Sequence, residues 1–326
     1  MAPGSTPDVA QLLIAGFDAG QTHTRCRLAW LHGDGSWHQL SEANGSGVCH
    51  LAAADGPMHF QAALASSRNA ALRAAGLAAD QPLAAACIGA SGIEANTPVQ
   101  ALGQQLGAAT LQIEPAQVVV LGDERTALAG AFQTGAGILV ISGTGCIAIG
   151  CDAHGQQHRC GGWGWLLDGA GSAMDIGRDA LAISVQMADG RLAETCLRDH
   201  LWRALSATSA QAVKAAVVDP QFGPAGFAQL APVVNALALQ GDRQAQRVIH
   251  RSAAALATMV STVAGALALS SPRVCGVGGA LTHLAALQNA FAQALEQACP
   301  GARLVPPGGD ACAGALRLAA QAALRC

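Results

Sequence analysis

Two short segments that combine glycine and threonine constrain the fold of this chain more than any other feature. The first, GFDAGQTHT at positions 16–24, follows the apolar run 12–15 and precedes a pattern of alternating apolar residues. The second, SGTG at 142–145, lies between the apolar runs 137–141 and 146–149. Because such runs are typical of β-strands, each segment is predicted to form the turn of a β-hairpin. The sequence thus predicts two halves that each begin with a similar hairpin.

The position of these turns excludes two common nucleotide-binding motifs. A P-loop and a dinucleotide-binding fingerprint place their glycines between a strand and a helix, whose amino terminus faces the phosphates. In a hairpin turn, glycine lets backbone N–H groups approach an anion, and the hydroxyls of Thr22 and Thr144 add donors. Asp18, at the start of the first turn, is placed to hold Mg²⁺ through water. We therefore predict two phosphate-binding turns, although hairpin turns accept glycine without any ligand.

The rest of the chain alternates between strand and helix patterns. Apolar runs at 83–88 and 118–121 predict strands, and the segments 61–75 and 124–133 predict helices. After the second hairpin the pattern is mainly helical. This alternation is typical of the α/β class, and 326 residues are enough for two compact lobes.

Composition and charge exclude several kinds of partner. A formal charge of −3 leaves no basic surface for a nucleic acid. The uncharged stretch 252–272 is rich in Ala, Ser, Thr and Gly, so we expect a buried helix there and no membrane span. The 11 cysteines form no C-x-x-C pair, which favours reduced thiols, and the amino terminus lacks the pattern of an export signal. We expect a cytoplasmic protein that acts on a small molecule, as a monomer or homodimer.

Asp123 is the candidate catalytic residue. It stands where the strand pattern 118–121 ends and a helix pattern begins. One interpretation is a helix N-cap, whose carboxylate accepts hydrogen bonds from free backbone N–H groups. The other is a general base, because open α/β sheets bind ligands at the carboxyl ends of their strands. A carboxylate placed there can accept the proton of a hydroxyl that attacks a γ-phosphate.

Two further glycine-containing segments suggest ligand contacts. CGGWGW at 160–165 can present backbone amides beside an aromatic wall for a sugar ring, or its tryptophan can fill the core. Gly278 and Gly279 follow a buried strand pattern. There the backbone can approach a flat ligand such as adenine, or a helix can pack closely.

Five segments, taken in order, resemble the motifs of one protein family. They are FDAGQTHT, LGDERTALAGAF, ISGTGCIAIG, GGWGWLLDGAGSAMDIGRDAL and GDACAGALRLA. The family patterns that they resemble are D-G-G-G-T-x-T, N-D-x-x-A-A-L-A-G, I-x-G-T-G-S-x-x-x-G, G-G-W-G-x-x-x-G-D-E-G-S-x-x-x-I-G-x-x-A-L and D-x-x-x-G-A-L. The chain therefore resembles the BadF/BadG/BcrA/BcrD-type ATPases. This group contains the N-acetylglucosamine and glucosamine kinases and belongs to the actin and hexokinase-like superfamily.

The resemblance implies a fold and a reaction. The fold is α/β, with two ribonuclease H-like (actin-like ATPase) lobes and ATP in a cleft between them. The terminal helix would return to the first lobe, so that this lobe would comprise residues 1–118 and 308–326 and the second lobe residues 119–307. The reaction would transfer the γ-phosphoryl group of Mg·ATP to a hydroxyl of an amino sugar.

The resemblance also implies roles for individual residues. Asp123 would be the catalytic base, and Asp18 would hold Mg²⁺ through water. The residues expected to bind the nucleotide are Asp18, Gly20, Gln21, Thr22, Thr24, Gly143, Thr144, Gly145, Gly278 and Gly279. Those expected to bind the sugar are Gly161, Gly162, Trp163, Asp168, Asn44 and Ser91.

The chain departs from the family pattern on the acceptor side. Where the family has G-D-E-G-S, this chain has DGAGS at 168–172, so the acid is shifted to Asp168 or replaced by Gly169. The asparagine that the sugar kinases carry after the first hairpin falls at Val48, unless Asn44 takes its place. Two alternatives therefore stay open: an ATPase that activates a dehydratase or reductase through an iron–sulfur cluster, and a nucleotide-dependent sugar-binding regulator without kinase activity. The first requires a recurring pair of cysteine ligands, and we find none in the sequence.

Overall fold

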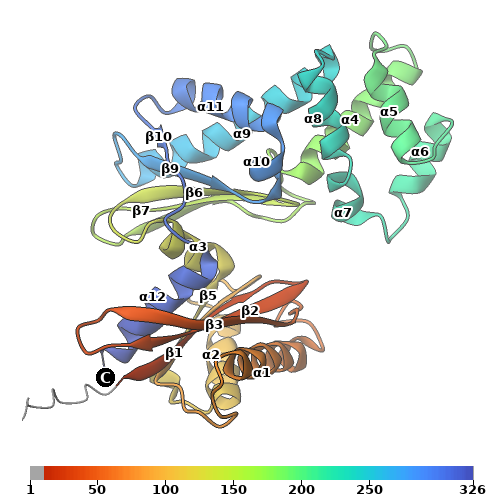
Figure 1. Cartoon of the computed structure of the whole chain (residues 1–326). Helices are drawn as coiled ribbons and strands as arrows, with labels where there is room; N and C mark the ends of the chain where they lie inside the picture. Colours follow the sequence, from red (N-terminus) through yellow and green to blue (C-terminus); the bar gives the residue numbers. More distant parts are fainter. Residues whose placement is uncertain (1–10, 326) are drawn as a thin grey trace, which may run out of the picture. The chain divides into compact units, whose positions relative to one another are not determined.

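The computed structural model describes residues 11–325, which fold into two compact units. The first lobe extends to Gln133 and resumes at Gly308, and the second lobe comprises Thr134–Pro307 (Figure 1). The export prediction depends on residues 1–10, which lie outside the described residues.

A five-stranded sheet in the order β3-β2-β1-β4-β5 forms the centre of the first lobe. β1 (Leu12–Ala19), β2 (His23–Leu31) and β3 (Trp37–Ser46) form an antiparallel meander. β4 (Ala85–Ala90) lies parallel to β1, and β5 (Val118–Gly122) lies parallel to β4. The predicted first hairpin is thus confirmed, with the glycine-containing segment as its turn.

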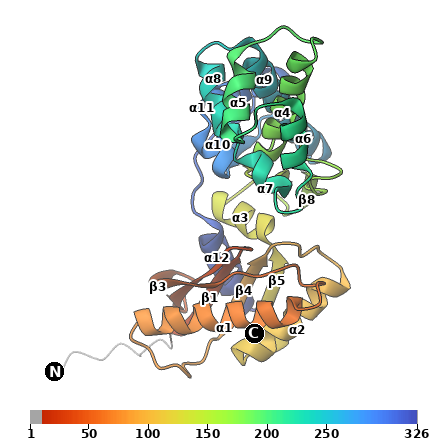
Figure 2. The same ribbon diagram turned by 90° about the vertical axis from the view of Figure 1, so that its right-hand side faces the viewer.

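Helices cover both faces of this sheet (Figure 2). On one face, α1 (Gly56–Ala74) packs on β2 and β3, and α2 (Pro98–Leu111) packs on β5. A short 3-10 helix, η1 (Pro115–Gln117), leads into β5. On the other face, the terminal helix α12 (Ala311–Ala323) lies along β1 and β4. Alternation of side chains along the strands therefore divides the apolar residues of this lobe between two buried clusters.

Helix α3 (Asp123–Ala131) packs against α12, and the two approach closely. A Cβ atom at Gly314 of α12 would lie 1.9 Å from the backbone oxygen of Thr126, so only glycine fits there. This contact packs α3 against the C-terminal helix α12 within the first lobe.

The boundary between the lobes corrects the prediction from sequence. The sequence placed residues 119–307 in the second lobe, whereas β5 and α3 belong to the first, which ends at Gln133. The reason is that β5 forms its hydrogen bonds with β4, a parallel strand distant in sequence. The chain returns to the first lobe at Gly308.

The sheet of the second lobe has the same connectivity as that of the first. Its strand order is β10-β9-β6-β7-β8, in which β6, β7 and β8 form an antiparallel meander and β9 lies parallel to β6. The weak internal repeat of the sequence is therefore a repeat of topology. The strands are β6 (Gly137–Ser142), β7 (Cys146–Cys151), β8 (Gln157–Gly161), β9 (Arg273–Val277) and β10 (Arg303–Leu304).

Helices make up most of the remaining second lobe. The long helix α9 (Arg243–Ala266) contacts β6, β7 and β8 and packs against α11 (Ala285–Ala298). A short helix, α10 (Gly279–His283), precedes α11, and the helical path breaks at Leu284 between them. The other helices are α4 (Ala173–Ala188), α5 (Cys196–Ala204), α6 (Ala210–Val217), α7 (Gly223–Ala228) and α8 (Ala231–Leu239).

Residues 252–266 of the uncharged stretch form the second half of α9, whose apolar residues belong to the core of the second lobe, and the rest of the stretch follows the helix. This confirms the expectation of a buried helix. Across residues 11–325, every helix is too short or too polar to span a bilayer.

Candidate active site

The first candidate phosphate turn is fixed by backbone hydrogen bonds and by a close crossing of the chain. The Gly20 N–H donates to the His23 oxygen (3.1 Å), and the Val48 N–H donates to the Gly20 oxygen (3.0 Å). A Cβ atom at Gly47 would lie 2.1 Å from the oxygen of Gln21, so the segment after β3 passes directly against the turn. Gln21 and Thr22 are exposed and therefore accessible to a ligand.

Thr24 differs from the other residues predicted to bind the nucleotide. It is fully buried, and its hydroxyl has no hydrogen-bond partner among the described residues. Its side chain points in the same direction along β2 as those of Cys26 and Leu28, which belong to the core. The structure thus places this hydroxyl inside the first lobe, and Thr22 is the threonine accessible at the turn.

Three parallel strands bring the other candidate residues of the first lobe to one edge of the sheet. Ala19 at the end of β1 pairs with Ala90 of β4, which pairs with Gly122 of β5. Ser91 follows β4, and its N–H donates to the Ala19 oxygen (3.3 Å). Asp123 follows β5. The first phosphate turn, Ser91 and Asp123 therefore lie at the same edge, where α/β sheets bind ligands.

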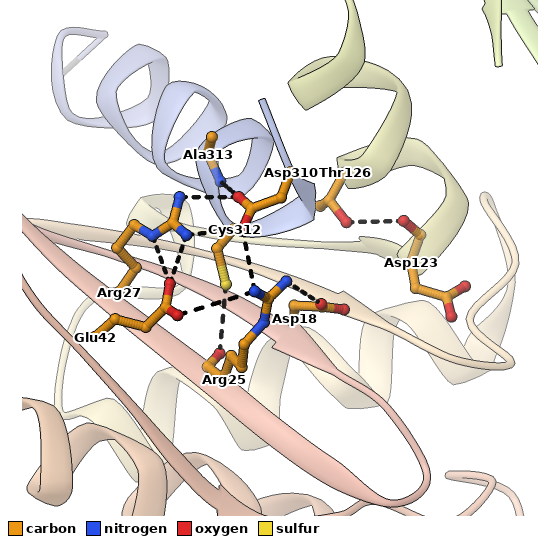
Figure 3. Close-up of polar contacts among 9 residues, drawn as sticks. All are labelled: Asp18, Arg25, Arg27, Glu42, Asp123, Thr126, Asp310, Cys312 and Ala313. Atoms are coloured by element: carbon orange, nitrogen blue, oxygen red, sulfur yellow. Dashed lines mark hydrogen bonds and ion pairs between the residues drawn. The ribbon is translucent and has the colours of Figure 1, made fainter. Parts of the chain in front are cut away.

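Asp123 is the first residue of α3, and the N-cap is Gly122. Its carboxylate accepts the Glu124 N–H (3.0 Å). Its carbonyl accepts the Thr126 hydroxyl (2.9 Å), as Figure 3 shows. Burial raises the pKa of Asp123 above its ordinary value of 3.8, and the charge of Asp18 raises it further, although hydrogen bonds from Glu124 act in the opposite direction. A carboxylate with a raised pKa beside a second carboxylate is typical of a functional site.

Asp18 is held by a group of charged side chains that the sequence did not predict (Figure 3). Its Oδ2 accepts a hydrogen bond from Nη2 of Arg25 (2.9 Å), and Nη1 of Arg25 binds Oδ2 of Asp310 (3.1 Å). Burial acts to raise the pKa of Asp310, but hydrogen bonds from Arg27 and from the Ala313 N–H hold it below its ordinary value of 3.8. One signal existed in the sequence: Arg25 and Arg27 stand two positions apart, on the same face of a strand.

The two candidate asparagine positions of the first lobe differ in exposure. Val48 is 4% exposed and lies in the core, so its side chain cannot contact a sugar in this conformation. Asn44 is exposed on β3 and pairs in register with Arg25 of β2. Asn44 is therefore the accessible one of the two.

The second candidate phosphate turn lies after β6 and is surrounded by other predicted residues. The Gly143 N–H donates to the Gly145 oxygen (2.8 Å), and Thr144 and Gly145 are exposed. A Cβ atom at Gly278, whose φ is +90°, would lie 2.5 Å from the Ser142 oxygen. Gly278 therefore fits against this turn because it is glycine, and the structure brings the two predicted glycine segments of the second lobe together.

Hydrogen bonds connect segment 168–173, which contains the shifted acid Asp168, to the same turn. The Ser142 hydroxyl donates to the Gly171 oxygen (2.7 Å), and the Ala173 N–H donates to the Gly143 oxygen (2.8 Å). The Cys146 thiol donates to the Ala170 oxygen (3.3 Å). A shift in this segment would therefore be transmitted to the turn.

The glycine–tryptophan loop leaves its aromatic side chain accessible. Gly161 and Gly162 have positive φ values of 80° and 78°. Trp163 is 63% exposed, and the guanidinium of Arg159 lies 4.8 Å from the centre of its ring. The alternative that this tryptophan fills the core is therefore wrong.

Asp168 accepts the Gly169 N–H (2.8 Å) and lies close to Gly161, so the shifted acid of this chain faces the glycine–tryptophan loop. It also lines an open pocket with Asp175, Arg178 and Arg251. The two arginines bind the two oxygens of Asp175, each at 2.6 Å.

The oxygen donors of the first lobe are compatible with a magnesium ion bound mainly through water. Asp18 supplies a carboxylate, a hard ligand of the type Mg²⁺ prefers, and its side chain is 27% exposed. The part of the chain that the structure describes contains no cluster of three or more His, Cys, Asp or Glu side chains that could enclose a metal. A single carboxylate together with nucleotide phosphates is the usual magnesium environment in phosphoryl-transfer enzymes.

Comparison with known proteins assigns the chain to a family. The model of the BadF/BadG/BcrA/BcrD ATPase family matches residues 15–319. The chain belongs to this ATPase family. The family resemblance found in the sequence is therefore confirmed, and both candidate phosphate turns lie within the matched region.

Curated relatives of this ATPase family member are sugar kinases. The chain is 28% identical over 205 residues to the N-acetylmuramic acid/N-acetylglucosamine kinase of Clostridium acetobutylicum, covering 62% of this chain and 67% of that protein. It is 29% identical over 187 residues to the N-acetyl-D-glucosamine kinase of Dictyostelium discoideum, covering 56% of this chain and 59% of that protein.

The fold of this family member matches a solved structure over nearly its whole length. A protein assigned as an N-acetylglucosamine kinase from Chromobacterium violaceum is 27% identical, with a TM-score of 0.72 over 94% of this chain and 99% of that chain. The predicted α/β fold with two related sheets is confirmed by this match and by the strand orders.

Proposed function

We propose that this protein is a kinase that transfers the γ-phosphoryl group of ATP to a hydroxyl of an amino sugar of the N-acetylglucosamine or glucosamine type. The observation that carries the proposal is the arrangement in the first lobe. There a half-buried carboxylate, Asp123, shares one sheet edge with a glycine–threonine turn and with Asp18. The sugar kinases among its relatives support the amino-sugar class.

In the first lobe, we assign phosphate binding to the turn and proton transfer to Asp123. The backbone of Gly20 and Gln21 and the exposed hydroxyl of Thr22 provide donors for phosphate oxygens. Asp18 would hold Mg²⁺ through water, and the bound ion neutralises phosphate charge. Ser91 and Asn44, which are accessible in the same lobe, are proposed sugar contacts.

In the second lobe, we assign a further set of contacts to the turn after β6. Gly143, Thr144 and Gly145 would contribute phosphate donors, and Gly278 with Gly279 would lie against the adenosine. The sugar contacts would come from the glycine–tryptophan loop and from the shifted acid. Those residues are Gly161, Gly162, Trp163 and Asp168.

The chemistry balances as one displacement at phosphorus. Asp123 accepts the proton of the sugar hydroxyl while the hydroxyl oxygen forms a bond to the γ-phosphorus. The bond from that phosphorus to the bridging oxygen breaks, and ADP leaves. Phosphoryl transfer depends mainly on positioning and charge neutralisation, so the fixed backbone of the turns matters more than covalent catalysis. The raised pKa of Asp123 makes it a stronger base than an exposed aspartate.

The test is ADP release measured with a panel of acceptors, with the phosphorylated sugar identified by mass spectrometry. The panel contains glucosamine, N-acetylglucosamine, N-acetylmuramic acid and glucose. Sugar-dependent ADP release that is fastest with an amino sugar supports the proposal. ADP release that stays the same with and without every sugar would contradict it and favour the regulator that binds nucleotide without transferring phosphate.

The activator of a dehydratase or reductase is less well supported by the cysteines. Cluster ligands are thiolates that contact the iron directly, whereas Cys146 and Cys312 are buried, and burial raises the pKa of each thiol to about 12. The free cysteines of the described chain are also scattered through both lobes. A purified protein with visible absorption near 400 nm and bound iron would revive this alternative.

A further inference from the structure

A group of five charged side chains lies beneath the first phosphate turn, on the face of the sheet that α12 covers (Figure 3). Asp18 comes from β1, Arg25 and Arg27 from β2, Glu42 from β3, and Asp310 precedes α12. Arg27 binds both oxygens of Asp310, each at 2.8 Å, and its Nε donates to Glu42 (2.7 Å). Arg25 is the member that also binds Asp18 (2.9 Å). We call these five residues the β2–α12 charge cluster.

Asp310 fixes the cluster from the far end of the sequence. Its Oδ1 accepts the Ala313 N–H (2.9 Å), so it is the N-cap of α12. The same carboxylate binds both arginines, which lie more than 280 positions earlier in the chain. Because one carboxylate serves a helix end and two guanidinium groups at once, its position is determined by α12 and β2 together.

Arg25 spans two carboxylates with separate nitrogen atoms. Nη2 binds Asp18 and Nη1 binds Asp310, and the side chain of Arg25 is 26% exposed. The planar guanidinium fixes the direction of both hydrogen bonds, which an ammonium group could not do. The bond to Asp18 occupies Oδ2 and leaves Oδ1 without a hydrogen bond among the described residues.

We propose that Arg25 is a positioning residue that holds the Asp18 carboxylate in the orientation in which its free oxygen faces hydrated Mg²⁺, and that Asp310 in turn fixes Arg25. This inference rests on the proposed use of Mg·ATP and goes beyond it. It assigns a role in metal and nucleotide binding to the N-cap of the last helix, which lies outside the turn itself. Arg25 acts through Asp18 and has no proposed contact with the reacting atoms.

Arg27 provides a matched control within the same cluster. It lies on the same strand and face as Arg25 and shares the partners Asp310 and Glu42, but it forms no hydrogen bond or ion pair with Asp18. Arg25→Gln and Arg27→Gln each remove one cation from the β2–α12 charge cluster. Only the first change removes the partner of Asp18.

The experiment measures the affinity of the full-length protein for a non-hydrolysable ATP analogue by calorimetry, with Mg²⁺ and with EDTA. The variants are Arg25→Gln, Arg25→Lys and Arg27→Gln, and their melting temperatures are recorded. The quantity compared is the ratio of analogue affinity with Mg²⁺ to analogue affinity with EDTA. We expect this ratio to be lower by about 10-fold or more in Arg25→Gln than in the wild type, the usual effect of removing a residue that orients a metal ligand. Its affinity in EDTA should change less than about 2-fold, because the phosphate donors of the turn stay in place.

Arg27→Gln should lower the melting temperature at least as much as Arg25→Gln, because the Arg27 side chain is the more buried of the two. It should nevertheless keep the whole increase in analogue affinity that Mg²⁺ provides. Arg25→Lys should recover part of that gain, since an ammonium can reach one of the two carboxylates. In steady-state kinetics, the KM for Mg·ATP should rise more in Arg25→Gln than kcat falls.

Equal loss of the Mg²⁺ effect in Arg25→Gln and Arg27→Gln would show that the cluster acts only through stability, and full retention in Arg25→Gln would also overturn the proposal. Either result leaves the proposed kinase activity intact if the wild-type protein still phosphorylates an amino sugar. A wild-type protein that does not bind the analogue under either condition would instead contradict the proposed function itself.

Discussion

The two lobes present the same arrangement of a hairpin beside a parallel strand, but they hold their candidate phosphate turns in different ways. In the first lobe, the acid at the turn is held by an ion pair with Arg25, which a carboxylate from the last helix fixes in place. In the second lobe, the turn is held by neutral hydrogen bonds from Ser142 and Ala173 and by the close approach of Gly278.

This difference shows that the same sheet topology can fix a turn in two ways: by ion pairs between side chains, or by neutral hydrogen bonds and close packing of the backbone. The first lobe carries the carboxylates proposed for magnesium binding and proton transfer, and the cation of Arg25 orients one of them, Asp18. The second lobe contributes backbone N–H groups, which need only a fixed path of the chain. We therefore expect changes in the first lobe to depend on salt and pH, and changes in the second to depend mainly on side-chain size.

The largest expected effect comes from the carboxylate at the edge of the first sheet. Asp123→Asn should lower kcat by about 10²- to 10⁴-fold, the range for loss of a general base, because an amide cannot accept the proton. The affinity for ATP should change little. Steady-state kinetics and calorimetry provide the measurements, and Asp189→Asn, which changes an exposed ion pair of the second lobe, is the control. Near-normal turnover of Asp123→Asn would refute its role as the base.

The next effect tests the dependence of the second lobe on shape. Gly278→Ala should lower the free energy of unfolding by about 2–4 kcal/mol and weaken nucleotide binding, because the new Cβ meets the Ser142 oxygen at a positive φ. Denaturant unfolding measures the first effect and calorimetry the second. The matched control for stability is Gly279→Ala, where no atom lies within 4 Å of an added Cβ. Equal losses in the free energy of unfolding for the two changes would contradict the steric explanation.

A smaller effect tests the dependence of the first lobe on charge. Asp310→Ala removes the N-cap of α12 and the partner of two arginines, and we expect a loss of about 2 kcal/mol in the free energy of unfolding at low salt. The loss should shrink in 1 M NaCl, which screens the ion pairs. Asp242→Ala removes the N-cap of α9 in the second lobe, a carboxylate that forms no ion pair among the described residues. Its cost should shrink less in 1 M NaCl, because salt screens only the interaction of this carboxylate with the helix end. Equal salt dependence of both variants would remove the distinction between the lobes.

The smallest change in stability comes from a single neutral hydrogen bond. Ser142→Ala should lower the free energy of unfolding by about 1 kcal/mol, because the buried Gly171 oxygen loses its donor. Thr262→Ala, which removes an exposed hydroxyl on α9, is the control and should cost less. Denaturant unfolding in low and high salt should give the same value for Ser142→Ala, since no charge is involved.

The pH dependence of activity sharpens the comparison further. The proposed base must be ionised, so kcat/KM should fall as the pH falls through the pKa of Asp123. Since burial and the charge of Asp18 raise that pKa, the fall should be centred above pH 3.8. Ser142→Ala should leave this limb of the profile in place, because the second lobe does not carry the titrating group. A limb centred at or below pH 3.8 would contradict the assignment.

Local patterns in the sequence were sufficient for the hairpins and for the position of the candidate base. The alternation along β2 and the glycine–threonine turns follow from residue types a few positions apart, and Asp123 follows a short apolar run. The return of the last helix to the first lobe was implied only by the family resemblance. Even the burial of Thr24 could have been predicted, since it lies two positions from buried Cys26 on the same face.

The sequence did not predict features that depend on contacts between distant segments. The lobe boundary was misplaced because β5 pairs with a parallel strand, and nothing local specifies that partner. The exposure of Trp163 depends on how the loop after β8 leaves the sheet, and the tether from Ser142 to Gly171 joins segments 29 positions apart.

Turn formation and the chemistry to bind phosphate or accept a proton could be inferred from residue types and their neighbours, because these are local properties. Which of these side chains meet depends on how whole helices and strands pack. The hydrogen bond from Arg25 to Asp310 spans 285 positions. The Asp310 carboxylate reaches Arg25 only when α12 packs on the first sheet. Long-range pairs of this kind depend on the packing of whole elements, and no local pattern records that packing.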